Sequence, residues 1–506
     1  MDMNQNIEAE KNNTISTSLE KNIEVLKQIF RDDETIVFRD FENSENENIK
    51  CSITYLGNMV KKDSINEFII KPIVESKIRG NEPELLNTII KRSLLNCDIE
   101  ILPDRLRLSE YLIDGYTLLF IEGITSAIAI DTKGYKVRSI EEPPSETLVR
   151  GPREGFTETI GVNITLLRRR LKTPDLTFKF REMGSRTKTR ICISYIKGIA
   201  QESIIDELEK RLNKLDIDGV LDSGYIEELI KDAPYLPFRT IGISERPDVI
   251  SGKLLEGRIA IFCDGSPSVL TLPYIFMEAF QSPEDYYNNY IYSSINRIIR
   301  WFGYLLTTSV PAIYTALVTF HQELIPTQLI LSVAQARQGV PFPTIVEALG
   351  MLLIFEILRE AGLRMPKPIG QAVSIVGALV LGDAAVNARL VSAPMVIIAA
   401  LTGISSFLIP QTLSTIVVRV ILLLLSASMG LYGYMYGVLG LTICLMSIRS
   451  FGVPYMLNIG SGTINFGTIK DTAFRAPLWS MTTRPKFISK DNARQKGVHT
   501  KGKKVP

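Results

Sequence analysis

The sequence predicts an α/β cytosolic region of two small lobes followed by an α-helical polytopic membrane domain. Charged residues concentrate before Arg300 and after Arg484, whereas nearly all long apolar runs lie between these positions. Before Arg300, short strand-like and helix-like segments alternate, which is typical of helices packed on a sheet. The chain of 506 residues is also too long for a single compact domain of ordinary size.

The region before the apolar runs divides at a linker that contains Pro143 and Pro144. Residues 1–50 form a polar N-terminal segment with one expected short helix at 19–30, and residues 41–50 are expected to be a polar loop. A first α/β lobe is expected over residues 51–142, with strands at 51–56, 117–121 and 126–130 and helices at 65–75, 83–95 and 104–113. A second α/β lobe is expected over residues 146–285, with strands at 190–195, 240–244 and 258–264 and helices at 202–215 and 223–231.

A charged segment follows the linker, RGPREGFTE at residues 150–158, and opens the most basic part of the second lobe. Two interpretations remain open. These charges can be solvated or form ion pairs between lobes or subunits, or the basic region can bind anionic lipid heads or an acidic partner. The candidate residues for coupling between lobes or subunits are Arg150, Arg153, Glu154 and Glu158.

Composition excludes several classes of function. The chain has two histidines and five widely spaced cysteines without a CxxC pair, so we expect no metal site and no disulfide framework. We find no GxxxxGK[ST], GxGxxG, GxSxG or HExxH motif, and we therefore expect neither a cofactor nor an enzymatic activity. A net charge of +2 gives no argument for nucleic-acid binding.

Five apolar runs indicate a transmembrane domain over residues 297–450, and they lie at 301–320, 345–358, 369–386, 391–409 and 415–448. A helix needs about 20 residues to span a bilayer, so the last run predicts two spans with a break at 430–440, and the total is about six helices. The segment 328–338 is expected to be amphipathic and interfacial. Residues 451–506 form a basic tail, and lysines and arginines favour the cytoplasmic side. Both termini are therefore predicted to be cytoplasmic, with the tail against membrane lipid.

Charged residues within the apolar runs are candidates for function because ionised groups in a bilayer usually face a bundle interior or water. Glu347, Glu356 and Arg419 are the buried membrane charges that the sequence predicts. The alternative for the two glutamates is a well-packed helix pair whose charged ends reach the interface.

The run at 369–386 is rich in small residues, and its continuation to residue 389 is the candidate pore helix. The pore-lining candidates are Val373, Val376, Val380, Asp383 and Asn387. A ring of valines would form an apolar gate, and Asp383 and Asn387 would attract cations at its mouth. The alternative is that the valines meet lipid while Asp383 pairs locally, for instance with Arg389.

Several long blocks resemble one known family. They include LPDRLRLSEYLIDGYTLLFIEG, RGPREGFTETIGVNITLLRRRLK, GSRTKTRICISYIKGIA, ISERPDVISGKLLEGRIAIFCDGSPSVLTLPY, PFPTIVEALGMLLIFEILREAGLRMPKPIGQAVSIVGALVLGDAAV and PYMLNIG. In these blocks, from about residue 51 to 484, the chain resembles the A subunit of the GerA-type spore germination receptors of endospore-forming bacteria. The resemblance implies a two-lobed cytosolic domain and a location in the spore inner membrane. It also implies assembly into an oligomeric ion channel that releases cations when nutrient is sensed.

The same resemblance implies three partners: other copies of this chain, a B-type transporter-like subunit and a C-type lipoprotein. One alternative is a paralogous A-type subunit, associated with the SpoVA dipicolinate channel, that amplifies germination. A secondary transporter is a second alternative, although we see no repeat between the halves of the membrane region. A membrane-tethered enzyme is the third, and the missing catalytic motifs oppose it.

Overall fold

The computed structural model describes residues 14–45, 49–75, 86, 89–90, 98–134, 142–143, 145–364, 380–409, 413–456, 471–472, 474–481, 483–485 and 487–490. These residues form two compact units. The first, which we call the lobed unit, comprises the described residues within Met1–Ile230, Ile241–Pro273 and Arg484–Arg494. The second, the helical unit, comprises those within Lys231–Thr240 and Tyr274–Thr483.

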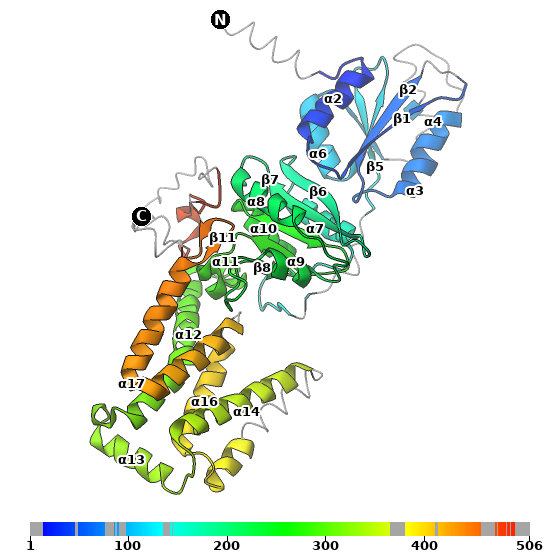
Figure 1. The fold of residues 1–506 in the computed structure, drawn as a ribbon. Helices are drawn as coiled ribbons and strands as arrows, with labels where there is room; N and C mark the ends of the chain where they lie inside the picture. The colour runs from blue at the N-terminus through cyan, green and yellow to red at the C-terminus, as the bar shows by residue number, and fades with distance from the viewer. Residues whose placement is uncertain are drawn as a thin grey trace, which may run out of the picture. The chain divides into compact units, whose positions relative to one another are not determined.

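The first lobe is built on a five-stranded antiparallel sheet of strand order β1-β2-β4-β5-β3 (Figure 1). The strands are β1 Ile36–Glu42, β2 Lys50–Leu56, β3 Ile99–Leu102, β4 Tyr116–Ile121 and β5 Ala127–Asp131. The strands predicted at 51–56, 117–121 and 126–130 are confirmed. The first lobe begins earlier than predicted, however, because β1 pairs with β2 from within the segment expected to hold only a helix. The β-branched and aromatic run Ile36, Val37 and Phe38 favours a strand there.

Helices cover both faces of this sheet (Figure 1). They are α2 Leu19–Ile29, η3 Arg105–Arg107 and α6 Leu108–Ile113 on one face, and α3 Lys62–Ile65, η1 Asn66–Ile70 and α4 Lys71–Glu75 on the other. Successive strand residues point to opposite faces, so β4 packs Leu118 and Phe120 against α2 and α6. Leu119 and Ile121 pack against α3, η1 and α4. The predicted helices at 19–30, 65–75 and 104–113 are confirmed, whereas the one predicted at 83–95 lies largely outside the described residues.

The second lobe has a five-stranded antiparallel sheet of order β6-β7-β9-β10-β8. Its strands are β6 Leu176–Met183, β7 Thr189–Ile196, β8 Gly242–Ser244, β9 Ile259–Cys263 and β10 Val269–Leu272, and its helices are α7 Ile160–Arg170, α8 Glu202–Asn213, α9 Ser223–Ile230 and α10 Pro247–Leu255. The three predicted strands and two predicted helices are present as β7, β8, β9, α8 and α9. Strands β6 and β10 and helices α7 and α10 were not predicted from the sequence.

The two lobes are copies of one architecture. The order β6-β7-β9-β10-β8 repeats the order β1-β2-β4-β5-β3 strand for strand. The pairing registers also correspond, because Ile36 faces Leu56 in the first lobe and Leu176 faces Ile196 in the second. Matching sequences occupy matching positions: ITYL at 53–56 corresponds to ISYI at 193–196, and FIEG at 120–123 to FCDG at 262–265. The lobed unit is therefore an internal repeat.

A buried ion pair joins the lobes within the lobed unit. Arg168 on α7 pairs with Asp33, which precedes β1, and both side chains are 1% exposed. The Arg168 Nη2 group also donates to Thr35 Oγ1 at 3.2 Å, and the guanidinium lies 4.8 Å from the centre of the Phe178 ring. Beside this pair the Glu34 N–H donates to the Phe178 carbonyl at 3.1 Å. The junction therefore combines a shielded charge pair with a backbone hydrogen bond.

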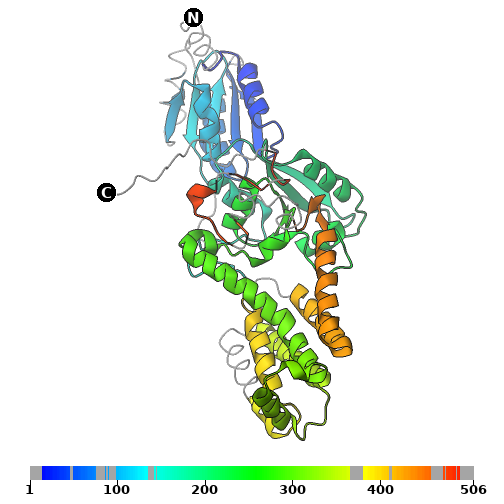
Figure 2. The same cartoon turned by 90° about the vertical axis from the view of Figure 1, so that its left-hand side faces the viewer.

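The helical unit is mainly α-helical in its described part (Figures 1 and 2), where residues 380–387 are helical and further elements have defined bounds. They are η4 Phe276–Phe280, α11 Glu284–Tyr287, α12 Tyr290–Thr319, η5 Gln322–Leu324, α13 Thr327–Arg337, α14 Thr344–Arg364, α16 Ala393–Ser406, α17 Leu413–Ser447, β11 Arg449–Ser450, β12 Val453–Pro454 and η6 Leu478–Ser480. α12 packs chiefly against α17 and α16. Among the described helices, two are long and apolar enough to cross a membrane, Tyr290–Thr319 and Ser414–Ser447. The count of about six spans stays a prediction, since residues 365–379 of the predicted third run lie outside the described part.

α17 reverses direction at Gly430, which has φ 62° and ψ −142° (Figure 1). A Cβ atom on Gly437 would lie 2.6 Å from the Leu422 side chain, although these residues would be roughly 20 Å apart in a straight helix. The run at 415–448 therefore forms two antiparallel arms, and the predicted break at 430–440 is confirmed. At the reversal, a Cβ on Gly430 would lie 2.6 Å from His321 Cε1.

We expect Arg168→Ala to lower the free energy of unfolding of the lobed unit by about 3–5 kcal/mol, because it leaves Asp33 buried without its counter-charge. Lys172→Ala is the matched control, since its pair with Asp114 is exposed, and we expect a change of about 0–1 kcal/mol. Denaturant unfolding of the purified full-length protein measures both. Equal effects of the two substitutions would contradict a structural role for the buried pair.

We expect Gly430→Ala to destabilise the helical unit by about 1–3 kcal/mol, because an L-residue is strained at this positive φ. Its methyl group would also clash with His321. In Gly440→Ala the added methyl group meets open space. That control should be neutral or stabilising by up to about 1 kcal/mol, since alanine is the better helix former. Thermal unfolding in detergent distinguishes them.

Candidate functional site

Two segments far apart in the sequence meet on the second lobe, the predicted coupling segment 150–158 and ERPD at residues 245–248. The Phe156 N–H donates to the Glu245 carbonyl at 2.7 Å. Arg246 has no exposed surface, and its Nη2 group donates to the Pro152 carbonyl at 2.6 Å and to Asp248 Oδ2 at 3.1 Å. Its Nη1 group donates to the Glu146 carbonyl at 3.1 Å. Arg246 thus fixes the linker between the lobes to the second lobe.

Beside Arg246 the linker carries a carboxyl group in an unusual environment. Burial raises the pKa of the Glu146 carboxyl above its ordinary value, although a hydrogen bond donated by Ser244 at 2.8 Å opposes the shift. The Ser145 hydroxyl donates to Glu245 Oε2 at 2.6 Å. The linker is therefore held by hydrogen bonds along its course, and its geometry supplies attachment rather than a reacting group.

The predicted coupling residues have different environments within this segment. Arg153 lies 3.9 Å from Glu142, and its side chain is 73% exposed. Glu154 pairs within the second lobe with Arg170 at 2.7 Å and Arg169 at 3.7 Å. The Glu158 carbonyl accepts from the Gly265 N–H at 2.8 Å. Arg150 is exposed. The structure thus assigns Glu154 to an ion pair inside one lobe and leaves Arg150 and Arg153 on the surface.

The predicted membrane charges are paired within the helical unit. The Glu347 side chain on α14 has no exposed surface; it accepts from Ser392 N at 3.0 Å and Ser392 Oγ at 2.8 Å, and pairs with Arg337 at 3.3 Å. Glu356, which is 31% exposed, pairs with Arg359 and, at 3.7 Å, with Arg419. Arg419 is 5% exposed. Both pairs therefore link different helices, α13 to α14 and α14 to α17.

The predicted pore-lining residues are only partly described. Val373 and Val376 lie outside the described residues. Residues 380–387 are helical, and Val380 is 57% exposed. Asp383 and Asn387 are also exposed, and the three positions share one helix face because they are three and four residues apart. Within the described part of the chain, this face therefore carries one apolar and two polar exposed side chains.

A charged cluster that was not predicted from the sequence lies near the start of α12. Asp285 on α11 pairs with Arg297 and Arg300 at 2.8 Å each, and Arg297 also reaches Asp471 at 2.8 Å. Although burial alone raises the pKa of the Asp285 carboxyl, hydrogen bonds from Arg300 and Arg297 outweigh it and hold that pKa below its ordinary value. In the sequence, only the i, i+3 spacing of these two arginines indicates that both could meet one acidic side chain.

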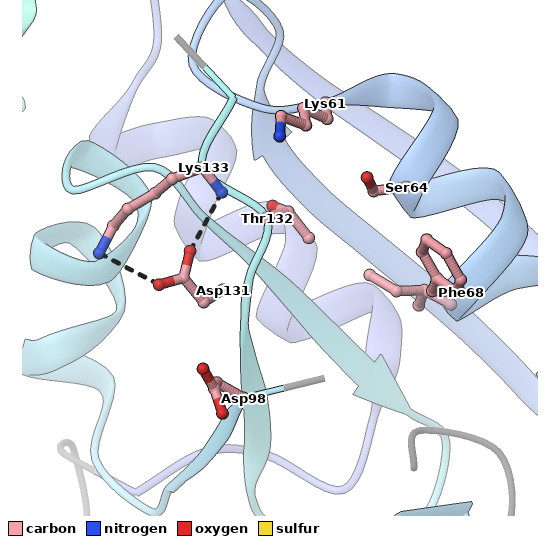
Figure 3. A pocket seen from close by; sticks show the side chains of 8 residues that line it. Lys61, Ser64, Phe68, Asp98, Asp131, Thr132 and Lys133 are labelled. Carbon is pink, nitrogen blue, oxygen red and sulfur yellow. Dashed lines mark hydrogen bonds and ion pairs between the residues drawn. The ribbon is translucent and has the colours of Figure 1, made fainter. Parts of the chain in front are cut away.

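The first lobe contains a polar pocket of about 280 Å³ (Figure 3). Lys61, Ser64, Asp98 and Lys133 are among the side chains that line it. Asp131 accepts from the Lys133 N–H at 3.1 Å and pairs with the Lys133 ammonium at 3.5 Å, which also lies 4.0 Å from the Tyr116 ring centre. The Asp131 and Lys133 charges are thus already partnered.

Within the described part of the chain, no group of three or more histidine, cysteine, aspartate or glutamate side chains could hold a metal ion. The described cysteines are free thiols. Burial raises the pKa of Cys51 to about 12 and that of Cys263 to about 11, which keeps both protonated and poorly nucleophilic.

Comparison with known proteins gives a consistent result. Residues 24–487 match the family model described as Bacillus/Clostridium GerA spore germination protein. Spore germination protein KA of Bacillus subtilis (strain 168) is 41% identical over 96% of this chain and 89% of its own length. The uncharacterized membrane protein YfkQ of the same organism is 42% identical over 97% of this chain and 95% of its length. The solved N-terminal domain of the A subunit of the Bacillus megaterium spore germinant receptor GerK3 aligns with 52% of this chain and 97% of that domain, with 32% identity and a TM-score of 0.42.

We expect Arg246→Ala to lower the free energy of unfolding by about 3–5 kcal/mol, because it leaves Asp248 and two carbonyl groups without their buried donor. The predicted coupling residue Arg153 is largely exposed, so Arg153→Ala should change stability by at most about 0.5 kcal/mol. Urea unfolding of the two variants, followed by far-ultraviolet circular dichroism, measures both changes. A loss of stability in Arg153→Ala as large as in Arg246→Ala would contradict this assignment.

Proposed function

The chain belongs to the GerA family of Bacillus/Clostridium spore germination proteins, and we propose that it is a membrane subunit of a nutrient germinant receptor that assembles with its own copies into an ion channel. Opening of the channel releases cations and triggers germination. The observation that carries this proposal is the pairing of Glu347 and Arg419 with opposite charges between apolar helices. A lipid anchor has no need of such charges, whereas a helix bundle around an ion path does.

The helical unit supports a multi-pass arrangement, which we place in the spore inner membrane as part of this proposal. α12 and α17 have the length and composition of membrane spans, and α17 contributes two arms. Each arm alone is short for a bilayer, which favours a place inside a bundle over direct exposure to lipid on all sides. The paired charges of α13, α14 and α17 would then lie within the bundle, where low polarity strengthens them.

The topology has support from the end of the chain. Residues 484, 485 and 487–490 belong to the lobed unit, which also contains the N-terminal lobes. Two segments of one compact unit lie on one side of a membrane, so the chain between them crosses it an even number of times. With lysine and arginine favouring the inner side, both termini are cytoplasmic.

The pore itself is assigned to the helix that contains residues 380–387. Asp383 and Asn387 are exposed in one copy of the chain, and a ring of copies would bring these side chains together around an axis. Val380, on the same face, would contribute an apolar constriction one turn before the polar ring. A B-type transporter-like subunit and a C-type lipoprotein complete the receptor in this proposal.

A planar-bilayer recording of the purified full-length protein tests the channel. We expect discrete conductance steps that favour cations, and Asp383→Asn should reduce cation selectivity because it removes one negative charge per subunit from the ring. Asn387→Asp is the matched opposite change, and it should increase that selectivity.

Glu360→Gln serves as a control, since Glu360 is exposed on α14 and pairs with Arg364 one turn away. It should leave selectivity unchanged. Saturable coupled flux without discrete steps would overturn the channel in favour of a transporter. Discrete steps that respond to neither Asp383→Asn nor Asn387→Asp would place the pore on another helix.

A further inference from the structure

Residues near the end of the chain pack on the second lobe. Ser489 forms an antiparallel bridge with Ala200, which follows β7, and the Lys490 N–H donates to the Ile199 carbonyl at 2.9 Å. The Arg484 Nε group donates to the Leu255 carbonyl at 2.8 Å, at the end of α10. These described residues, 484, 485 and 487–490, follow the helices of the helical unit in sequence, yet they belong to the lobed unit.

The first lobe makes the same contacts with a segment of its own. Lys133, just after β5, forms an antiparallel bridge with Val60, and the Gly134 N–H donates to the Met59 carbonyl at 3.0 Å. In the internal repeat, Met59 and Val60 correspond to Ile199 and Ala200. Ser489 and Lys490 therefore stand where Lys133 and Gly134 stand in the first lobe.

A pair of glycines marks the same place in each lobe. Gly115 precedes β4 with φ 90°, and a Cβ on it would lie 3.2 Å from the Lys133 side chain. Its counterpart Gly257 precedes β9 with φ 96°, and a Cβ on it would lie 3.0 Å from Ser489 Cα. Each glycine thus leaves room for the segment that bridges to the lobe beside it. In the first lobe this segment is Lys133 and Gly134, and in the second lobe it is Ser489 and Lys490 from the C-terminal tail.

The second lobe cannot provide this segment from its own sequence. After β10 the chain leaves the lobed unit, which ends at Pro273, and continues in the helical unit from Tyr274. We propose that residues 484, 485 and 487–490 form a docking segment that completes the second lobe of the same chain. The surface that receives it is formed by Ile199, Ala200, Leu255 and Gly257.

The anchor of the docking segment is apolar. Ile488 has no exposed surface, whereas its neighbour Phe487 is 57% exposed. The ion pair between Lys490 and Glu202 at 2.9 Å is exposed and adds little. The chain leaves the second lobe at Pro273 and returns to it with the docking segment. Docking of this kind therefore attaches both ends of the helical region to the same lobe. This inference does not depend on channel activity.

Disulfide trapping in the full-length protein tests the proposal. Ala200 and Ser489 are bridge partners in antiparallel backbone, where the Cα separation suits a disulfide. We expect Ala200→Cys combined with Ser489→Cys to form an intramolecular disulfide under mild oxidation, identified by mass spectrometry of the linked peptides. Ala200→Cys combined with Phe487→Cys is the matched control, since the Phe487 side chain is largely exposed and is not the bridge partner of Ala200, and it should give little product.

Two results would overturn the proposal. One is the absence of the linked peptide in the Ala200→Cys, Ser489→Cys protein. The other is a covalent dimer formed when copies that carry only Ala200→Cys are mixed with copies that carry only Ser489→Cys, because the segment would then dock on a neighbouring copy.

A substitution at Ile488 distinguishes a disulfide that forms because the segment is docked from one that forms by random collision of the two cysteines. Adding Ile488→Asp to the double-cysteine protein should lower the yield of the disulfide by at least about tenfold, because the buried isoleucine side chain supplies most of the attachment. Phe487→Asp should lower it by less than about twofold. Equal effects of the two substitutions would show that the segment is not held through Ile488.

Discussion

The structure depends on keeping buried charges paired. Arg168 and Arg246 in the lobed unit, and Arg297 and Glu347 in the helical unit, are almost completely removed from solvent, and each has an opposite charge within 4 Å. Removing a charge from water carries a large penalty that only a well-placed partner and further hydrogen bonds offset. Such pairs contribute little net stability, but they permit few alternative arrangements. They therefore specify which segments meet: lobe with lobe, linker with lobe, and helix with helix.

Individual helices and strands were easier to predict from the sequence than the repeat that relates the two lobes. Alternation of apolar and polar residues indicates β2, whereas β4 and β5 are short apolar runs that flank the turn at Glu122 and Gly123. The reversal near Gly430 follows from the helix-breaking effect of glycine. β6 was missed because LTFKFREM lies in a strongly basic stretch, where its alternation of apolar and charged residues was attributed to solvated surface. The internal repeat was missed because its identity is confined to short pieces such as ITYL and ISYI. Only the equal strand orders make the repeat evident, since fold is retained after most side chains have changed.

The candidate site was predictable to a similar degree. Glu347 and Arg419 were recognisable because an ionised group within an apolar run needs a partner, and the structure supplies one for each. The partners were not predictable, because Arg337 and Ser392 come from other segments whose distance is set by helix packing. Asp285 was not predicted for the same reason, because the two arginines that pair with it lie on a different helix. Asp383 stays a prediction, since its role requires several copies of the chain.

The contact between Ser489 and Ala200 also has a consequence for biosynthesis. A ribosome adds about 5–20 residues per second, so tens of seconds separate the synthesis of β10 from that of the segment that completes its lobe. During this interval the helical region is synthesised while the second lobe exposes the surface beside Gly257. A nascent chain whose synthesis stops early would keep that surface open and would be a substrate for chaperones and proteases. The second lobe therefore completes its fold only after residues 487–490 have been synthesised.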